Sequence, residues 1–157
     1  MNIPVVFRNH FQCGYVVRDI DKAIANMGEK FGVSKWQINR LSADAPGRAL
    51  GFAYVQNVMI ELVDVRPEQE TIYRSWIPES DTAVRLHHLG YMIDTEEEWR
   101  SVISQFKAAG FRTALEGSVG DILDYYYADT VAELGHYCEF VRLKPAGKSF
   151  WANVPHN

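Results

Sequence analysis

The sequence has few of the features that mark a secreted, membrane-spanning or disulfide-bonded protein. It contains only two cysteines, Cys13 and Cys138, and no CxxC pair, so no disulfide framework is expected. No apolar run is long enough to span a bilayer, and the N-terminal residues lack the basic region and the small-residue cleavage site of a secretory signal. These absences favour a cytoplasmic protein.

Clusters of Lys and Arg are also absent. The 16 basic residues are outnumbered by 20 acidic ones, which gives a net charge of −4. A sequence without basic clusters offers no site that would collect phosphates or anionic lipids, so nucleic-acid and membrane partners are not expected. Hydrophobic residues make up 47% of the 157 positions, which is enough for a buried core in one domain or in two small fused modules.

One short motif occurs twice. The segments QCGYVVRD (12–19) and HLGYMIDT (88–95) are similar and begin 76 residues apart. In each half, an apolar strand then contains a Glu. Glu61 lies 49 residues after Gln12, and Glu139 lies 51 residues after His88. A duplicated unit that places one N or O donor and one carboxylate per copy can bring four ligands to a single point. The repeat therefore predicts a divalent metal site.

The first half, residues 1–66, is predicted to form a β-α-β-β-β unit. After a strand at 11–17, Asp19 is a typical helix N-cap and Gly32 a typical helix stop. Between them, apolar residues recur at helical spacing and predict the buried face of the helix: Ile20, Ile24, Met27 and Phe31. Further strands are expected at 36–41, 50–55 and 58–64, and the last two are predicted to pair as a hairpin.

The second half, residues 85–143, repeats this order after a Pro-containing, charged linker at 67–84. A strand at 86–93 precedes Thr95, which has Glu98 three residues later in a capping-box pattern. Strands are then expected near 112–116, 122–128 and 136–143, and residues 144–157 form a C-terminal tail. Two tandem β-α-β-β-β modules predict an α+β fold.

Alternation along the strands decides which side chains share a surface. Gln12 shares its face with His10, which could contact a ligand, and His88 is expected to point away from His87. A carboxylate within an apolar strand is costly to bury unless it is paired or metal-bound, and Glu61 and Glu139 stand at equivalent points of the two repeats. The remaining histidines are expected to be structural: His87, His136 and His156.

Together these pieces resemble the vicinal oxygen chelate superfamily, which includes glyoxalase I, methylmalonyl-CoA epimerase, extradiol dioxygenases and fosfomycin-resistance proteins. The resemblance covers residues 8–143. It rests first on the opening strand, whose donor Gln12 lies seven residues before Asp19. The other features are Asp21-Lys22-Ala23, Ile60-Glu61-Leu62, His87-His88-Leu89-Gly90, and Gly135 leading to Glu139. It implies that the modules form an open, curved mixed sheet. Position by position, it implies four metal ligands: Gln12, Glu61, His88 and Glu139.

Three oxygen donors and one imidazole suit one divalent ion of Zn, Ni, Co, Mn or Fe. Two carboxylates leave a neutral site around such an ion, so an incoming enolate is not repelled, and open coordination positions can act as a Lewis acid. A carboxylate that leaves the metal can take a proton, which makes Glu139 or Glu61 the expected general base. The leading hypothesis is a glyoxalase-like, metal-dependent lyase or isomerase that acts on a small carbonyl or hydroxyl substrate with adjacent oxygens.

Aromatic residues on the predicted strands favour an apolar or aromatic substrate. Alternation sends Tyr125 and Tyr127 to one face and Tyr126 to the other. The residues expected to bind the substrate are His10, Phe52, Tyr54, Tyr125, Tyr127 and Tyr137.

Two other functions of the same fold are considered. A non-catalytic, antibiotic-type binding protein generally lacks the metal ligands, whereas this chain has all four candidates. An extradiol-type dioxygenase would have Fe(II), and His where Gln12 stands. His10 is the residue that could supply this donor instead, so the identity of the metal would discriminate. Methylmalonyl-CoA epimerase-like enzymes use a further Glu before the second ligand, but residues 36–59 contain no Glu, which speaks against a two-base epimerisation.

A homodimer is expected from two observations. Paired-module sheets of this superfamily are often completed by a second subunit. In addition, apolar side chains occur in segments that should otherwise be solvated: Trp76, Ile77, Phe150 and Trp151.

Overall fold

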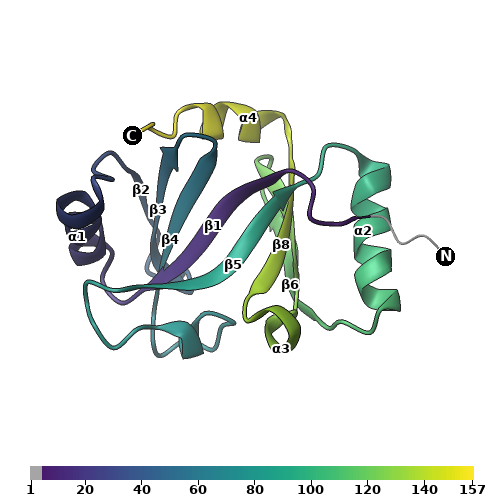
Figure 1. The fold of residues 1–157 in the computed structure, drawn as a ribbon, viewed down its shortest axis with the longest axis horizontal. Coiled ribbons are helices and arrows are strands. Elements are labelled where there is room, and N and C mark those ends of the chain that lie inside the picture. The colour runs from purple at the N-terminus through teal and green to yellow at the C-terminus, as the bar shows by residue number, and fades with distance from the viewer. Residues whose placement is uncertain (1–4) are drawn as a thin grey trace. The chain divides into compact units, whose positions relative to one another are not determined.

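The computed structural model describes residues 5–157 and contains two successive β-α-β-β-β modules (Figure 1). The first comprises β1 (His10–Val17), α1 (Ile20–Phe31), β2 (Gln37–Arg40), β3 (Gly47–Val55) and β4 (Val58–Val65). The second comprises β5 (Val84–Met92), α2 (Glu96–Ala108), β6 (Thr113–Val119), β7 (Leu123–Ala128) and β8 (Tyr137–Leu143). Three short helices complete the described chain: η1 (Arg74–Trp76), α3 (Val131–Leu134) and α4 (Pro145–Ala152).

The strands form an eight-stranded sheet in the order β2-β3-β4-β1-β5-β8-β7-β6. β1 and β4 pair in parallel, whereas β3 and β4, β6 and β7, and β7 and β8 pair antiparallel. The order ends in two unpaired edges, so the sheet is open, and each module contributes its four strands in the equivalent order. The structure confirms the predicted α+β fold with tandem β-α-β-β-β modules and a mixed sheet.

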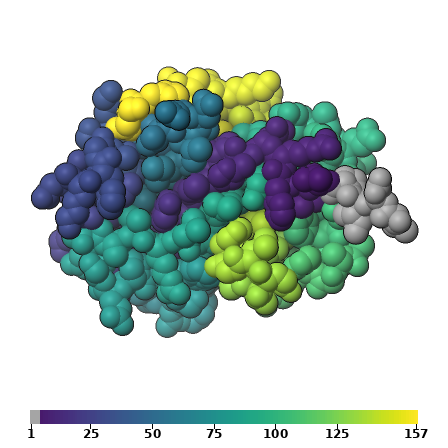
Figure 2. All heavy atoms as spheres, in the orientation of Figure 1, coloured from purple at the N-terminus to yellow at the C-terminus, as the bar shows by residue number. Residues whose placement is uncertain are grey.

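Residue contacts divide the chain into two compact units. The first unit contains Gln12–His88 and Asn153–Asn157, and the second contains Met1–Phe11 and Leu89–Ala152. Each unit therefore combines most of one module with a short segment from the far end of the chain. In the first unit, the Tyr54 backbone N–H donates to the Pro155 carbonyl at 2.8 Å. Figure 2 shows the corresponding yellow C-terminal atoms against the blue atoms of the β3–β4 hairpin.

The core of the first unit lies between α1 and its strands. Ile20 and Ala23 of α1 pack with Leu62 of β4, and all three are almost completely buried. The helix ends at Gly32, whose φ of 74° is left-handed, as the sequence predicts. Phe31 was expected in the buried stripe but is 67% exposed. That expectation is wrong because the side chain belongs to the last helical residue, where the chain turns away from the sheet.

The N-cap of α1 offers a direct test of local stabilisation. The Asp19 carboxylate accepts hydrogen bonds from the backbone N–H groups of Asp21 and Lys22, each at 3.1 Å. We expect Asp19→Ala to lower the free energy of unfolding by about 1 kcal/mol, the usual loss when an N-cap acceptor is removed. Asp44→Ala, in an exposed loop, is the matched control and should change it by less than about 0.5 kcal/mol. Equal effects in chemical denaturation would contradict the capping role.

The core of the second unit lies between α2 and strands β7 and β8. Thr95 caps α2 by accepting a hydrogen bond from the Glu98 N–H at 3.1 Å, as predicted. Tyr126, Cys138 and Phe140 pack on the α2 side and are fully buried. None of the helices within residues 5–157 has the length and apolar character that crossing a membrane requires.

Three of the four apolar residues behind the homodimer expectation pack inside their own units. In the linker, Trp76 and Ile77 contact a buried cluster of Val16, Val63 and Val65. In α4, the Trp151 ring lies 4.9 Å from that of Phe11 and is 8% exposed. These side chains therefore no longer support a subunit interface, and the homodimer stays a prediction.

Candidate metal centre

Strands β1 and β4 of the first unit place candidate residues side by side. In the parallel register, Gln12 lies opposite Met59 and Gly14 opposite Glu61. Residues in register on paired strands project to the same face of the sheet. The sequence spacing of the first repeat therefore positions an amide and a carboxylate on one surface.

Glu61 and His88 come together on this surface. The Glu61 Oε2 atom lies 3.1 Å from His88 Nε2. The His88 side chain is fully buried, and the Glu61 side chain is only 12% exposed. A carboxylate in such surroundings needs a partner, because its transfer out of water is costly. Two of the four predicted ligands are thus adjacent, with a carboxylate oxygen facing an imidazole nitrogen.

Gly14 provides the space that His88 occupies. A Cβ atom at this position would lie 2.0 Å from His88 Cε1 and 2.1 Å from His88 Nε2, far inside contact distance. Only glycine permits the imidazole to lie against β1 beside Glu61. The sequence patterns predicted no functional role for Gly14. The signal was present, since both copies of the repeated motif carry a glycine two residues after the proposed ligand.

Gln12 is buried, with 3% of its surface exposed. Its Nε2 donates to the Met59 sulfur at 3.5 Å, so the amide oxygen is the opposite end of the side chain. An amide oxygen is the atom through which a glutamine binds a metal ion, and this orientation is compatible with that role.

His87 is a residue that sequence reasoning underestimated. Strand alternation was expected to separate it from His88, but the two Nδ1 atoms are 2.9 Å apart and the rings are inclined by 88°. Its Nε2 lies 3.1 Å from the Ile72 carbonyl oxygen. Burial lowers the pKa of His87 to about 3, and His88 acts in the same direction, whereas the hydrogen bond to Ile72 acts in the other. The adjacent His-His pair was the available signal.

Phe52 and Tyr54 share the face of Glu61. In the antiparallel register of β3 and β4, Phe52 lies opposite Glu61 and Tyr54 lies opposite Met59. Phe52 is buried, whereas Tyr54 stacks on the exposed His156 with ring centroids 4.7 Å apart. Burial raises the pKa of the Tyr54 phenol. An aromatic residue is therefore the cross-strand neighbour of Glu61.

The second unit repeats this arrangement around Glu139. On β7 and β8, Tyr127 lies opposite Glu139 and Tyr125 lies opposite Val141. Tyr137 is two residues from Glu139 on the same strand and so shares its face. Because Tyr126 points into the α2 core, the predicted alternation of the three tyrosines is confirmed. Glu139 is 8% exposed, so this carboxylate is also buried on an aromatic face.

The donor types fit a divalent metal ion. Glu61, His88 and Glu139 are residues that could hold one. Carboxylate oxygens combined with an imidazole nitrogen suit Zn, Ni, Co, Mn or Fe(II), and the close approach of Glu61 to a buried nitrogen matches such a site.

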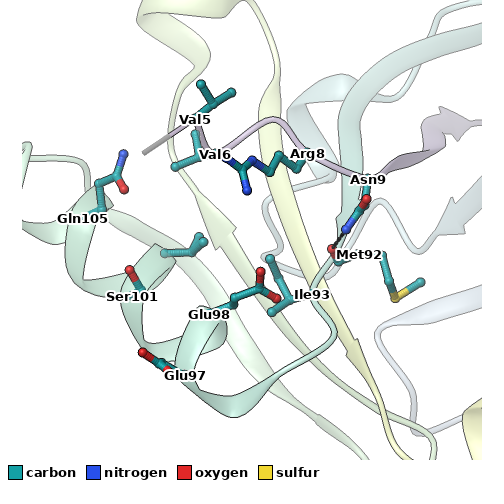
Figure 3. Close-up of a pocket in the computed structure, with 11 residues that line it drawn as sticks. Val5, Val6, Arg8, Asn9, Met92, Ile93, Glu97, Glu98, Ser101 and Gln105 are labelled. Atoms are coloured by element: carbon teal, nitrogen blue, oxygen red, sulfur yellow. Dashed lines mark hydrogen bonds between the residues drawn. The ribbon is translucent and has the colours of Figure 1, made fainter. Parts of the chain in front are cut away.

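His10 and a surface pocket lie in the second unit. The His10 ring is exposed and 5.5 Å from that of Tyr91, which belongs to the core beneath α2. Figure 3 shows a pocket between the N-terminal segment and α2. Its volume is about 190 Å³, and none of the predicted site residues lines it. Its lining is Val5, Val6, Arg8, Asn9, Met92, Ile93, Glu97, Glu98, Ser101, Val102 and Gln105.

Comparison with solved structures shows the same fold in known enzymes. Methylmalonyl-CoA epimerase from Mycobacterium tuberculosis has 14% sequence identity and a TM-score of 0.64, over 95% of this chain and 97% of that chain. A variant of Streptomyces coelicolor methylmalonyl-CoA epimerase in complex with 2-nitronate-propionyl-CoA has 12% identity and a TM-score of 0.62, over 86% and 96%.

Comparison of the sequence itself gives the family. No curated protein matches the chain. The model of the glyoxalase/bleomycin resistance protein/dioxygenase superfamily matches residues 11–127, which is most of the chain. The match agrees with the duplicated motif and with the sheet described above. The chain belongs to the glyoxalase/bleomycin resistance protein/dioxygenase superfamily.

Proposed function

We propose that the protein is a glyoxalase-like, metal-dependent lyase or isomerase. The observation that carries this proposal is the buried contact of Glu61 with His88, at 3.1 Å. Under the proposal, one divalent ion is held by Gln12, Glu61, His88 and Glu139. Gln12 and Glu61 lie on neighbouring strands of the first unit, and Glu139 occupies the equivalent place in the second repeat.

The bound ion would supply Lewis acidity toward two adjacent substrate oxygens. Glu139 is the residue we assign as general base, because release of its carboxylate restores its affinity for a proton. Gly135, four residues before it, has a left-handed φ of 79° and begins the turn into β8. Glu61 is the symmetric alternative, but it lies in the middle of β4, which is paired on both sides.

The proposed substrate class is supported by the strand neighbours of the two carboxylates. Phe52 is the cross-strand neighbour of Glu61, and Tyr127 is that of Glu139. These rings favour an apolar or aromatic carbonyl or hydroxyl compound. The Streptomyces epimerase variant is in complex with 2-nitronate-propionyl-CoA, but strands β2 and β3 of this chain contain no acidic residue that could act as a second base. We therefore propose a reaction with one carboxylate base.

The test compares Glu139→Gln with Glu61→Gln. The wild-type protein is first freed of metal, reloaded with single divalent ions, and assayed against aliphatic and aromatic dicarbonyls and catechols. We expect isomerase or lyase turnover of a dicarbonyl by the wild type, and a loss of turnover of at least about 100-fold in Glu139→Gln. The metal content of both variants is measured alongside turnover. Near-normal turnover and metal content in Glu139→Gln would refute its role as the base. Ring cleavage of catechols with Fe(II) would instead support the dioxygenase alternative.

A further inference from the structure

His87 is fully buried, yet the proposed ligand set gives it no task. Its imidazole makes two polar contacts, with the Ile72 carbonyl oxygen at Nε2 and with His88 at Nδ1. A buried side chain with both nitrogens engaged has a defined protonation pattern, which can be worked out from its partners.

The first partner fixes the proton on His87. A carbonyl oxygen can only accept, so the contact of 3.1 Å with Ile72 requires a hydrogen on His87 Nε2. Removal from water disfavours a charged ring, and a neutral imidazole has a single N–H. His87 Nδ1 therefore carries a lone pair and acts as an acceptor.

The second contact transmits this pattern to His88. Because His87 Nδ1 accepts, the hydrogen between the two Nδ1 atoms, 2.9 Å apart, belongs to His88. His88 therefore carries a hydrogen on Nδ1. Its Nε2 faces Glu61 Oε2 at 3.1 Å. A carboxylate oxygen only accepts, so without a metal ion this contact requires a hydrogen on Nε2 as well, and a bound ion would take the place of that hydrogen.

The linker holds His87 in this position. The ring lies 4.5 Å from the ring of Tyr73 and 5.2 Å, edge-on, from that of Trp76. The Arg85 guanidinium lies over the Trp76 ring, 4.9 Å from its centroid, in a cation–π contact. The same linker supplies the Ile72 carbonyl, so its folding on the first unit determines the orientation of His87.

We propose that the Ile72 carbonyl and His87 form a hydrogen-bond relay that fixes His88 in its Nδ1–H form and presents Nε2 for metal binding. His87 is thus a positioning residue that acts through His88. The metal-binding part of this inference rests on the proposed function, but the proton positions do not. A ligand histidine commonly donates its second N–H to an acceptor, and here that acceptor is a second histidine.

The proton positions can be measured in the metal-free protein. In ¹⁵N-histidine-labelled wild type near pH 7, we expect the ¹⁵N NMR signature of a hydrogen on Nδ1 of His88, and for His87 a hydrogen on Nε2 and none on Nδ1. The His87→Phe spectrum identifies the two rings by difference. A His88 ring without a hydrogen on Nδ1 in the wild type would overturn the relay, whatever the protein does with metals.

Metal affinity tests the consequence. His87→Phe keeps an aromatic ring between Tyr73 and Trp76 but removes both nitrogens, and we expect Zn²⁺ or Ni²⁺ to bind about 10–100-fold more weakly. His156→Phe, which replaces another ring that stacks on a tyrosine, should leave the affinity unchanged. Unchanged affinity in a folded His87→Phe protein would overturn the positioning role. If the wild type binds no metal while His88 is in its Nδ1–H form, the proposed function fails and the relay stands.

Discussion

His88→Ala is expected to abolish tight binding of the divalent ion. His88 is the only nitrogen donor of the proposed set, and its Nε2 approaches Glu61 within 3.1 Å. Mutation of a residue that hydrogen-bonds to a metal ligand usually weakens metal binding about 10–100-fold. His88 is itself a proposed ligand, so we expect its loss to decrease the affinity by more than about 100-fold. Calorimetric titration of the chelator-treated protein with Zn²⁺, Ni²⁺ and Mn²⁺ measures this directly.

The matched control for this variant is His136→Ala. The His136 ring lies in the second unit, with Nδ1 2.9 Å from the Tyr137 carbonyl oxygen, and the proposal gives it no contact with metal. We expect its affinity to equal that of the wild type. Glu61→Ala should behave like His88→Ala, because it removes the other member of the buried pair. Full metal occupancy in both Glu61→Ala and His88→Ala would refute the four-ligand assignment.

Gly14→Ala is expected to disrupt the site without removing any ligand. The added methyl group would lie 2.0 Å from His88 Cε1, so the imidazole must leave its place beside Glu61. The β1 backbone cannot easily retreat, because it is hydrogen-bonded to β4 from Gln12 to Val17. We expect metal affinity to fall by more than about 100-fold, as for loss of the ligand. Overpacking should also lower the free energy of unfolding by about 1–3 kcal/mol.

Gly28→Ala separates this effect from the general effect of replacing glycine. Gly28 lies within α1, where a Cβ atom would meet only ordinary contacts, the nearest being Ser34 Cβ at 3.6 Å. Because alanine is a better helix former, we expect a gain in stability of about 0.5–1 kcal/mol with metal affinity unchanged. Wild-type affinity in Gly14→Ala would show that His88 does not need the space above Gly14.

Several features of this protein follow from sequence signals that act over a few residues. Asp19 and Thr95 cap the two long helices as predicted, because a cap requires only a side-chain acceptor and the next turn of backbone. Strand alternation placed Tyr126 in the core and Tyr127 beside Glu139. The repeated motif predicted the two modules, since equal segments at equal spacing fold into equal units.

Other features depended on which strands and segments meet. The space at Gly14 is functional only because His88, 74 residues later, lies against it. His87 was expected to be merely structural, but its role depends on the Ile72 carbonyl, which the linker brings to its ring. The last residues of the chain pair with Tyr54 of the first module. Composition and periodicity describe each segment alone, whereas these contacts are set by packing and strand register between distant segments. The sequence by itself therefore determined the strands, the two long helices and the candidate ligands, but not the short helices η1, α3 and α4. The tertiary structure decided what surrounds the candidate ligands.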